Sequence, residues 1–587
     1  MNTEHRNLDQ IQLTSRRAFL RRAGSTILGA ATVPAILAAC GASAAPASSS
    51  TGAGAAASAS SSTGAAAAAP VASSAAGSAS AVAGATGTLQ VSNNDFLGES
   101  MDPIVGSGTF WNRAICDLLI DHDASGHYIG RVADSWDISP DGLTWTFHIH
   151  KGIKFHNGDP LTAQDVIFSM QHFGDKKSTN PWSPYVTAHA TDISAPDDYT
   201  VVYKLQAPEL SIREPLAQTI IMPKNYFAKV GEDGWQKAPI GSGPFKFVEH
   251  VPKTSLTLAA NADYWGPDKP RWSKIVETLV PDEATRIAKL QRGEADIIPA
   301  VSADNQLSLK SKGFRLQQQG IDGFMSVSFS GTWLTKNPTS DIRVRQAMSY
   351  AINRQEIANT FYRGLAKPGG YWFWTTETWA HDYDPASWSA AKAPQLQYDL
   401  AKAKQLLQEA GFPDKFSQKT IPLYTPAGPS ADLMQVLQGY WHNIGLAVDV
   451  KVVDTAVFYG LIFKRAKSAT DQIVGAIWPW GPSGPATAFF NNVYHTANLF
   501  TSHGVLSTGN DPKADQLYQA AVHEPDESKA KKMWNDFMHY GYDVMWVNVP
   551  IVEAPSNLVV GPKVGSFGAY AKKLSLEEAY LGIQHAG

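Results

Sequence analysis

Residues 41–87 form a tract that cannot build a core by itself, and this tract divides the chain into three parts. It consists almost entirely of Ala, Ser, Gly, Thr, Pro and Val, with no charged and no aromatic residue. Such a composition cannot bury enough apolar surface to offset the entropy lost on ordering. As a coil it would span about 40 Å. We therefore expect a leader over residues 1–39, a disordered tether over 40–87, and a folded body from Thr88 onward.

The leader carries two export motifs in sequence. Ser15-Arg16-Arg17-Ala18-Phe19-Leu20-Arg21 fits the twin-arginine signal, with Arg16 and Arg17 as its arginine pair. Leu37-Ala38-Ala39-Cys40 follows and resembles a lipobox. This order predicts an exported chain whose mature end, Cys40, carries lipid on its sulfur and faces the periplasm or the cell exterior. The alternative is an uncleaved membrane anchor, for which the weakly apolar segment Ala23–Ala39 is at the short limit.

The composition of the body limits its class. About 500 residues exceed what one hydrophobic core usually serves, so two or three lobes are expected. The full chain has a net charge of -4, and five of its arginines lie in the leader. The sequence has no basic patch interleaved with aromatic residues, which is the pattern that would indicate nucleic-acid binding. Cys116 is the only cysteine besides Cys40, so we expect a buried apolar thiol rather than an internal disulfide.

Local patterns predict alternating helices and strands, which indicates an α/β class with mixed sheets. Thr162 and Asp165 have the spacing of a capping box at the start of a helix. Gly411 stands where a helix from Asp399 should stop. Further elements follow from period-2 or period-3.6 spacing: strands at Leu143–Ile149 and Val448–Val452, and helices from Ser340 and over Ala431–Asn443.

Four blocks of the body resemble the family 5 extracellular solute-binding proteins of ABC importers, the dipeptide, oligopeptide and nickel receptor group. They follow one another in family order along nearly the whole body. The blocks are VADSWDISPDGLTWTFHIHKGIKFHNGDPLTAQDVIFSM (Val132–Met170), PIGSGPFKF with NADYWGPDKP and LQRGEADII (Pro239–Ile298), DIRVRQAMSYAINRQEI (Asp341–Ile357), and DLAKAKQLLQEAGFP with the helix and strand ending at Val453.

The resemblance implies a two-lobed periplasmic-binding-protein-like fold with a hinge of two crossovers. Lobe one would take residues 88–322 and 548–587, with an extra subdomain at about 121–222, and lobe two residues 323–547. It also implies a monomeric receptor that closes its lobes on a solute and delivers it to an ABC permease. No enzyme activity, cofactor or metal is implied, and peptide transport is the family's general label.

The charge anchors that the family uses for short peptides are missing here. Peptide-binding members carry an acidic residue for the ammonium group in the region of WPWGPSGPATAFFNN, yet Gln472–Asn510 contains no Asp, Glu, Lys or Arg. Dipeptide receptors hold the carboxylate with an arginine, yet Tyr424–Gln435 has none. An unpaired buried charge is costly. A neutral oligosaccharide or an opine-like compound therefore stays open as an alternative to a peptide held by its backbone.

Aromatic faces stack on sugar rings, planar groups and cations, so they lead the ligand-binding candidates. Each tryptophan can equally fill a lobe core, as we expect for Trp136 and Trp145. The segment Gly106–Trp111 should follow the first strand and reach the cleft between the lobes, where it adds a second, smaller set of candidates. The candidates are Trp478, Trp480, Ser483, Trp372, Trp374, Asn491, Thr109 and Phe110.

Two other classes of function have weak support in the sequence. A secreted hydrolase would need a motif such as G-x-S-x-G, and GPSGP around Ser483 places its second glycine one position early. A metal site could use His148, His150 and His156. The alternation of the strand that carries His148 and His150 already explains them as a solvated face.

Overall fold

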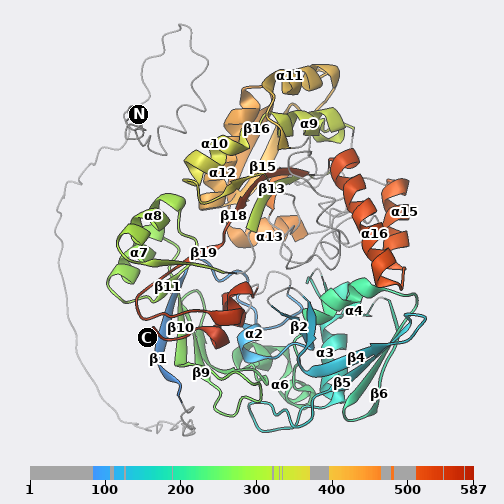
Figure 1. Ribbon diagram of the computed structural model, residues 1–587, viewed down its shortest axis with the longest axis vertical. Helices are drawn as coiled ribbons and strands as arrows, with labels where there is room; N and C mark the ends of the chain where they lie inside the picture. The colour runs from blue at the N-terminus through green and yellow to red at the C-terminus, as the bar shows by residue number, and fades with distance from the viewer. Residues whose placement is uncertain are drawn as a thin grey trace, which may run out of the picture.

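The structure is a computed structural model that describes residues 84–105, 111–123, 127–180, 182–187, 189–319, 323–329, 331–332, 335–369, 396–463, 477–480, 511–546, 548–573 and 575–586. It has two lobes, one above the other in Figure 1, each built on its own large sheet.

Lobe one is built on a seven-stranded mixed sheet. Its order is β12 (Arg315–Gln318), β19 (Asn557–Val560), β11 (Ile297–Ile298), β1 (Thr86–Asn93), β10 (Trp272–Leu279), β9 (Ser255–Ala260) and β8 (Phe245–Val251). β1 runs parallel to β10 and β11, and the other pairs are antiparallel. The helices of this lobe are α2 (Asn112–Ile115), α6 (Lys224–Lys237), α7 (Glu283–Gln291), α8 (Ala303–Ser311) and, near the C-terminus, η9 (Gly568–Lys572), α17 (Leu576–Ala579) and η10 (Tyr580–Gly582).

A smaller sheet projects from lobe one and has its own core. Its order is β4 (Ala133–Ile138), β5 (Thr144–Ile149), β7 (Thr200–Leu205) and β6 (Ala190–Asp197). Trp145 is fully buried in its core and Trp136 packs against that core half-buried. The surrounding elements are β2 (Ile120–His122), β3 (Tyr128–Gly130), α3 (Ala163–Phe173), α4 (Ser183–Thr187), η1 (Leu210–Ile212) and α5 (Arg213–Ala217).

Lobe two is built on a six-stranded mixed sheet. Its order is β14 (Lys367–Pro368), β18 (Asn548–Ala554), β13 (Gly323–Phe329), β17 (Ile477–Trp480), β15 (Thr420–Pro426) and β16 (Ala447–Val453). Its helical elements are η2 (Pro338–Ser340), α9 (Ile342–Tyr350), α10 (Arg354–Glu356), η3 (Ile357–Phe361), α11 (Leu400–Glu409), α12 (Pro429–His442), α13 (Thr455–Phe463), α15 (Pro512–Val522), α16 (Glu527–His539) and η8 (Tyr540–Met545).

The chain passes between the two large sheets twice in the described residues. It leaves β12 at Gln318 and enters β13 at Gly323. It returns between the end of β18 at Ala554 and the start of β19 at Asn557. β18 pairs with β13 and β14 of lobe two. The return therefore lies after Ala554 and not at Asn548, because the strand from Asn548 completes the sheet of lobe two.

The elements expected from local patterns are present. Asp165 caps α3, since its Oδ2 accepts hydrogen bonds from N (2.9 Å) and Oγ1 (3.0 Å) of Thr162. The predicted helices correspond to α9, α11 and α12, and the predicted strands to β5 and β16. Gly411 has a φ of 75° directly after α11, a conformation that glycine adopts without strain. Cys116 is buried and forms no disulfide.

The leader, with Arg16, Arg17 and Cys40, lies outside the described residues. The expected tether extends two residues too far, because β1 begins at Thr86. Thr86 pairs in register with Trp272, and its N–H donates to the carbonyl of Arg271 (3.0 Å). Within the described part of the chain, no helix combines the length and the apolar character that a bilayer span requires.

Candidate functional site

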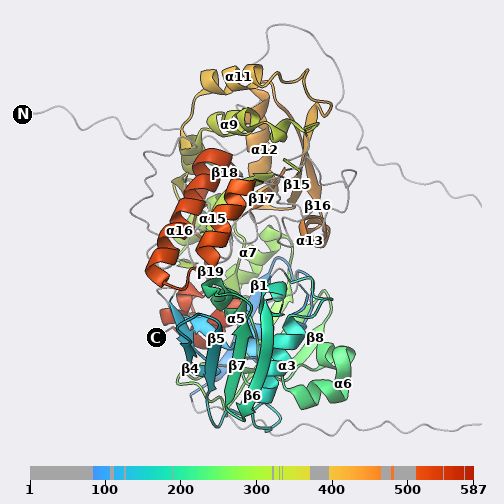
Figure 2. The same cartoon turned by 90° about the vertical axis from the view of Figure 1, so that its right-hand side faces the viewer.

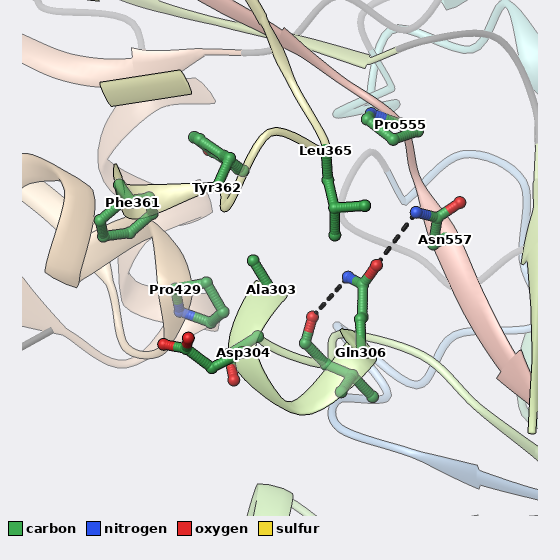
Figure 3. A pocket seen from close by; sticks show the side chains of 11 residues that line it. Ala303, Asp304, Gln306, Phe361, Tyr362, Leu365, Pro429, Pro555 and Asn557 are labelled. Atoms are coloured by element: carbon green, nitrogen blue, oxygen red, sulfur yellow. Dashed lines mark hydrogen bonds between the residues drawn. The ribbon is translucent and has the colours of Figure 1, made fainter. Parts of the chain in front are cut away.

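A small crevice, with a cavity volume of about 70 Å³, lies where the two lobes meet, beside the return crossover (Figure 3). Its lobe-one wall, Val301–Gln306, follows β11 and includes the start of α8. Pro429 on the opposite wall follows β15 and opens α12. The carboxyl ends of strands are where open α/β sheets usually bind ligands.

The walls of the crevice are mainly apolar. Lobe two contributes Phe361, Tyr362, Leu365 and Pro429, and the crossover contributes Pro555. Figure 3 shows these side chains around the space above the first turn of α8. Residues from four separate segments of the chain therefore surround one space, and a movement of one lobe relative to the other would change its shape.

Two amide side chains fix the polar end of the crevice. Asn557 donates from Nδ2 to Oε1 of Gln306 (3.0 Å), and Gln306 donates from Nε2 to the carbonyl of Val301 (2.7 Å) (Figure 3). Gln306 is 9% exposed. These bonds connect β19 to α8. The amide donors and acceptors that they leave unused can form hydrogen bonds with a molecule bound in the crevice.

One carboxylate lines the crevice, and it is paired across the lobes. Arg363 of lobe two donates from Nε to Oδ1 of Asp304 (2.6 Å) and from Nη2 to Oδ2 (3.4 Å). The Asp304 side chain is 46% exposed, so this pair adds little to stability. It does reduce the charge that the crevice presents. Apolar walls with paired amides suit a neutral or internally compensated ligand better than a single charge.

The histidines considered as metal ligands have other partners. His148 and His150 are 46% and 40% exposed and contact Asp137 (2.8 Å) and Asp134 (2.7 Å). His156 is half-buried, its Nε2 contacts the carbonyl of Gly243 (3.0 Å), and desolvation lowers its pKa to about 4. Among the described residues, no group of three or more His, Cys, Asp or Glu side chains is arranged to hold a metal ion.

Most of the sequence-predicted binding residues fall outside the described residues. These are Thr109, Phe110, Trp372, Trp374, Ser483 and Asn491. The backbone of Trp478 and Trp480 is described, in β17. Trp480 pairs in register with Ser326 and Trp478 with Ser328, at the centre of the lobe-two sheet. Their role in binding stays a prediction.

The sequence did not point to the crevice residues. Gln306, Tyr362 and Asn557 belong to three separate segments and have no motif spacing. The one usable signal was positional, since α8 follows a strand of the LQRGEADII block.

Comparison with known proteins gives one family and one fold. Residues 127–501 match the family described as bacterial extracellular solute-binding proteins, family 5 Middle. A curated relative, di/tripeptide-binding protein 1 of Pseudomonas aeruginosa, is 27% identical over 466 residues, which cover 73% of this chain and 81% of the relative.

Two solved structures share the fold. The binding protein AgaA from A. tumefaciens R10, in complex with agropinic acid, has a TM-score of 0.71 at 24% identity and covers 85% of this chain and 99% of its own. The binding protein DppA from Helicobacter pylori, in complex with the peptide STSA, has a TM-score of 0.69 at 22% identity and covers 86% and 98%.

Proposed function

Because the chain belongs to the bacterial extracellular solute-binding proteins of family 5, we propose that its two lobes close around a solute held between them. It is the solute receptor of an ABC importer and not an enzyme. The observation that supports closure is the interlobe crevice, whose walls come from lobe one, lobe two and a crossover. Closure is a population shift, so only contacts that the solute makes in the closed state can drive it. The closed form would then dock on the permease as a monomer.

Peptides are the first candidate for the solute. The curated relative is a di/tripeptide receptor, and the Helicobacter pylori fold neighbour holds a tetrapeptide. The second candidate is a neutral oligosaccharide or an opine-like compound. The uncharged segment Gln472–Asn510 favours it, and the paired Asp304 and Arg363 leave no single charge in the crevice. A peptide bound here would be held by its backbone rather than by its charged ends.

A thermal-shift screen tests the solute class. The probes are Ser-Thr-Ser-Ala, a di- to hexapeptide series, the same peptides with acetylated and amidated ends, agropinic acid and neutral oligosaccharides. A solute at 100 times its Kd adds about 2.7 kcal/mol to the stability of the folded state. We expect peptides to stabilise the protein, and blocked peptides to bind within about threefold of free ones, since no charge anchor would be lost.

The outcomes of the screen separate the alternatives. A tenfold or greater preference for free peptide ends would mean that charged anchors exist outside the sites considered. Stabilisation by agropinic acid or oligosaccharides alone would replace peptide by the second solute class. A screen in which every probe fails would contradict both solute classes.

We further propose that the receptor is exported by the twin-arginine route and held to the membrane by lipid on Cys40. In a host that has both twin-arginine export and lipoprotein processing, Cys40→Ser should move the protein from the membrane fraction to the soluble exported fraction. Arg16→Lys with Arg17→Lys should stop export, whereas the control Arg21→Lys should not. Membrane retention of Cys40→Ser would instead support an uncleaved anchor at Ala23–Ala39.

A further inference from the structure

The lobes touch at a second place, on the other side of the molecule from the crossovers. The hairpin of α15 and α16 leaves lobe two and reaches the small sheet domain of lobe one, next to α4 and α5 (Figures 1 and 2). No residue of this hairpin lines the crevice. The contact therefore connects the lobes without using the proposed solute site.

The hairpin is rooted firmly in lobe two. It continues into η8, and Arg345 of α9 donates to the carbonyls of Met545 (2.7 Å) and Trp546 (2.9 Å) that follow. Within the hairpin, Tyr518 packs edge-on against Trp534 and Phe537, with ring centroids 5.8 and 5.9 Å apart. It should consequently move with lobe two as one body.

Its free end makes polar contacts with lobe one. Glu527, at the start of α16, accepts a hydrogen bond from Nη1 of Arg213 in α5 (3.1 Å). His523, at the end of α15, donates from Nδ1 to the carbonyl of Pro208 (3.1 Å). Arg213 is also held over the ring of Tyr128, 5.1 Å from its centroid, so its guanidinium is already placed for Glu527.

Beneath these contacts lies a buried layer shared by both lobes. Tyr518 of lobe two is 4% exposed, and Tyr185 and Glu209 of lobe one are 8% and 2% exposed. Burial, and then the nearby Tyr185 and Glu209, raise the pKa of Tyr518 well above its ordinary value. Such a layer forms only while the hairpin covers lobe one, so opening the lobes would return it to water.

The buried carboxylate of Glu209 is compensated within lobe one. It contacts Nδ1 of His189 and accepts a hydrogen bond from Oγ of Ser211 (3.1 Å). A buried carboxylate without such partners would oppose closure. With them, lobe one presents a largely neutral surface to Tyr518.

We propose that this contact is a clasp that holds the lobes together in the absence of solute and thereby sets solute affinity without touching the solute. The clasp comprises Tyr185, His189, Pro208, Glu209 and Arg213 of lobe one with Tyr518, His523 and Glu527 of lobe two. This inference rests on the proposed lobe closure. Because apparent affinity scales with the population of the competent state, loosening the clasp weakens binding of any solute and speeds its release.

Single-molecule FRET on the solute-free, full-length chain tests the clasp. Dyes are attached through Lys176→Cys in lobe one and Lys513→Cys on α15, both exposed positions. Cys40→Ser removes the exported thiol, and Cys116 is 1% exposed. The wild-type clasp should give mainly the short interlobe distance. Glu527→Lys places two cations together and should lower the closed-to-open ratio about three- to tenfold.

Matched variants separate the clasp from general effects on folding. Asp536→Lys makes the same charge change on α16, away from lobe one, and should leave the ratio unchanged. Arg213→Gln removes the guanidinium that donates to Glu527 and should also open the lobes, whereas Arg292→Gln removes an exposed guanidinium elsewhere in lobe one and should not. Clasp variants whose ratio matches the wild type, or a wild type with only the long distance, would overturn the proposal. Since no solute is present, failure of the solute screen would not affect this result.

Discussion

Arg345→Met is expected to lower the free energy of unfolding by about 3–5 kcal/mol, since it leaves several buried carbonyls unpaired at about 1–3 kcal/mol each. The guanidinium donates to the carbonyls of Trp546 (2.9 Å), Thr339 (2.6 Å), Ser340 (3.2 Å) and Met545 (2.7 Å). Burial lowers the pKa of Arg345 to about 10, which still leaves it charged at neutral pH. Methionine fills much of the space but donates nothing.

Urea unfolding followed by tryptophan fluorescence and circular dichroism measures this loss. Arg292→Met is the control, because Arg292 is 56% exposed and its removal should leave the free energy of unfolding close to the wild-type value. The Arg345 variant should also loosen the root of the clasp hairpin, since Trp546 has a left-handed φ of 51° that the bonds to its carbonyl help to hold. Equal stability of the two variants would show that other groups satisfy these carbonyls.

Glu277→Gln is expected to flatten the fall in stability that the wild type shows as pH rises from about 4.5 to 8. Glu277 is fully buried in lobe one. Its Oε1 accepts from the hydroxyl of Tyr580 (2.6 Å) and its Oε2 from Nε1 of Trp111 (3.2 Å) and from Asn93. Burial, and then the neighbouring Glu577, raise the pKa of Glu277 from 4.5 to about 8.

The sign of this effect follows from proton binding. Between the unfolded pKa and the folded pKa the folded state holds a proton that the unfolded state has lost. The stabilising contribution is complete below about pH 4.5 and is lost as pH rises through about 8, at up to about 1.4 kcal/mol per pH unit. Glutamine cannot titrate, so its profile should lack this slope even if its stability at pH 5 is lower.

Melting temperatures from pH 5 to 9 test the Glu277 prediction. Glu294→Gln serves as the control, because Glu294 lies on the surface of the same lobe and its pKa is lowered, mainly by its hydrogen bond with Arg292. Its profile should keep the wild-type slope in this range. A Glu277→Gln profile parallel to that of the wild type would mean that another group carries the slope.

The family and the local elements were predictable because they depend on neighbouring residues. The capping of α3 by Asp165 and the stop of α11 at Gly411 follow from positions three or four apart. The family blocks similarly predicted two lobes and two crossovers. The end of the tether at Thr86 and the return after Ala554 were less well predicted, since pairing with distant strands decides where each strand begins and ends.

The same distinction, between features set by neighbouring residues and features set by distant ones, applies to the binding candidates. The tryptophan-rich segments were recognised by composition, and the side chains of those segments lie outside the described residues. The crevice was not foreseen, because Gln306 and Asn557 are separated by 251 positions and have ordinary residue types.

The sequence by itself therefore determined the family, the α/β class and the local caps, all of which depend on patterns a few residues long. Only the tertiary structure decided what the polar groups do inside the body. Arg345 belongs to the recognised block DIRVRQAMSYAINRQEI, yet its partners Met545 and Trp546 lie 200 and 201 positions away. Arg213 and Glu527 meet across the lobes over 314 positions. Hydrogen bonds act over about 3 Å, so a group's partner is set by how the lobes pack and cannot be read from the residue's own neighbourhood.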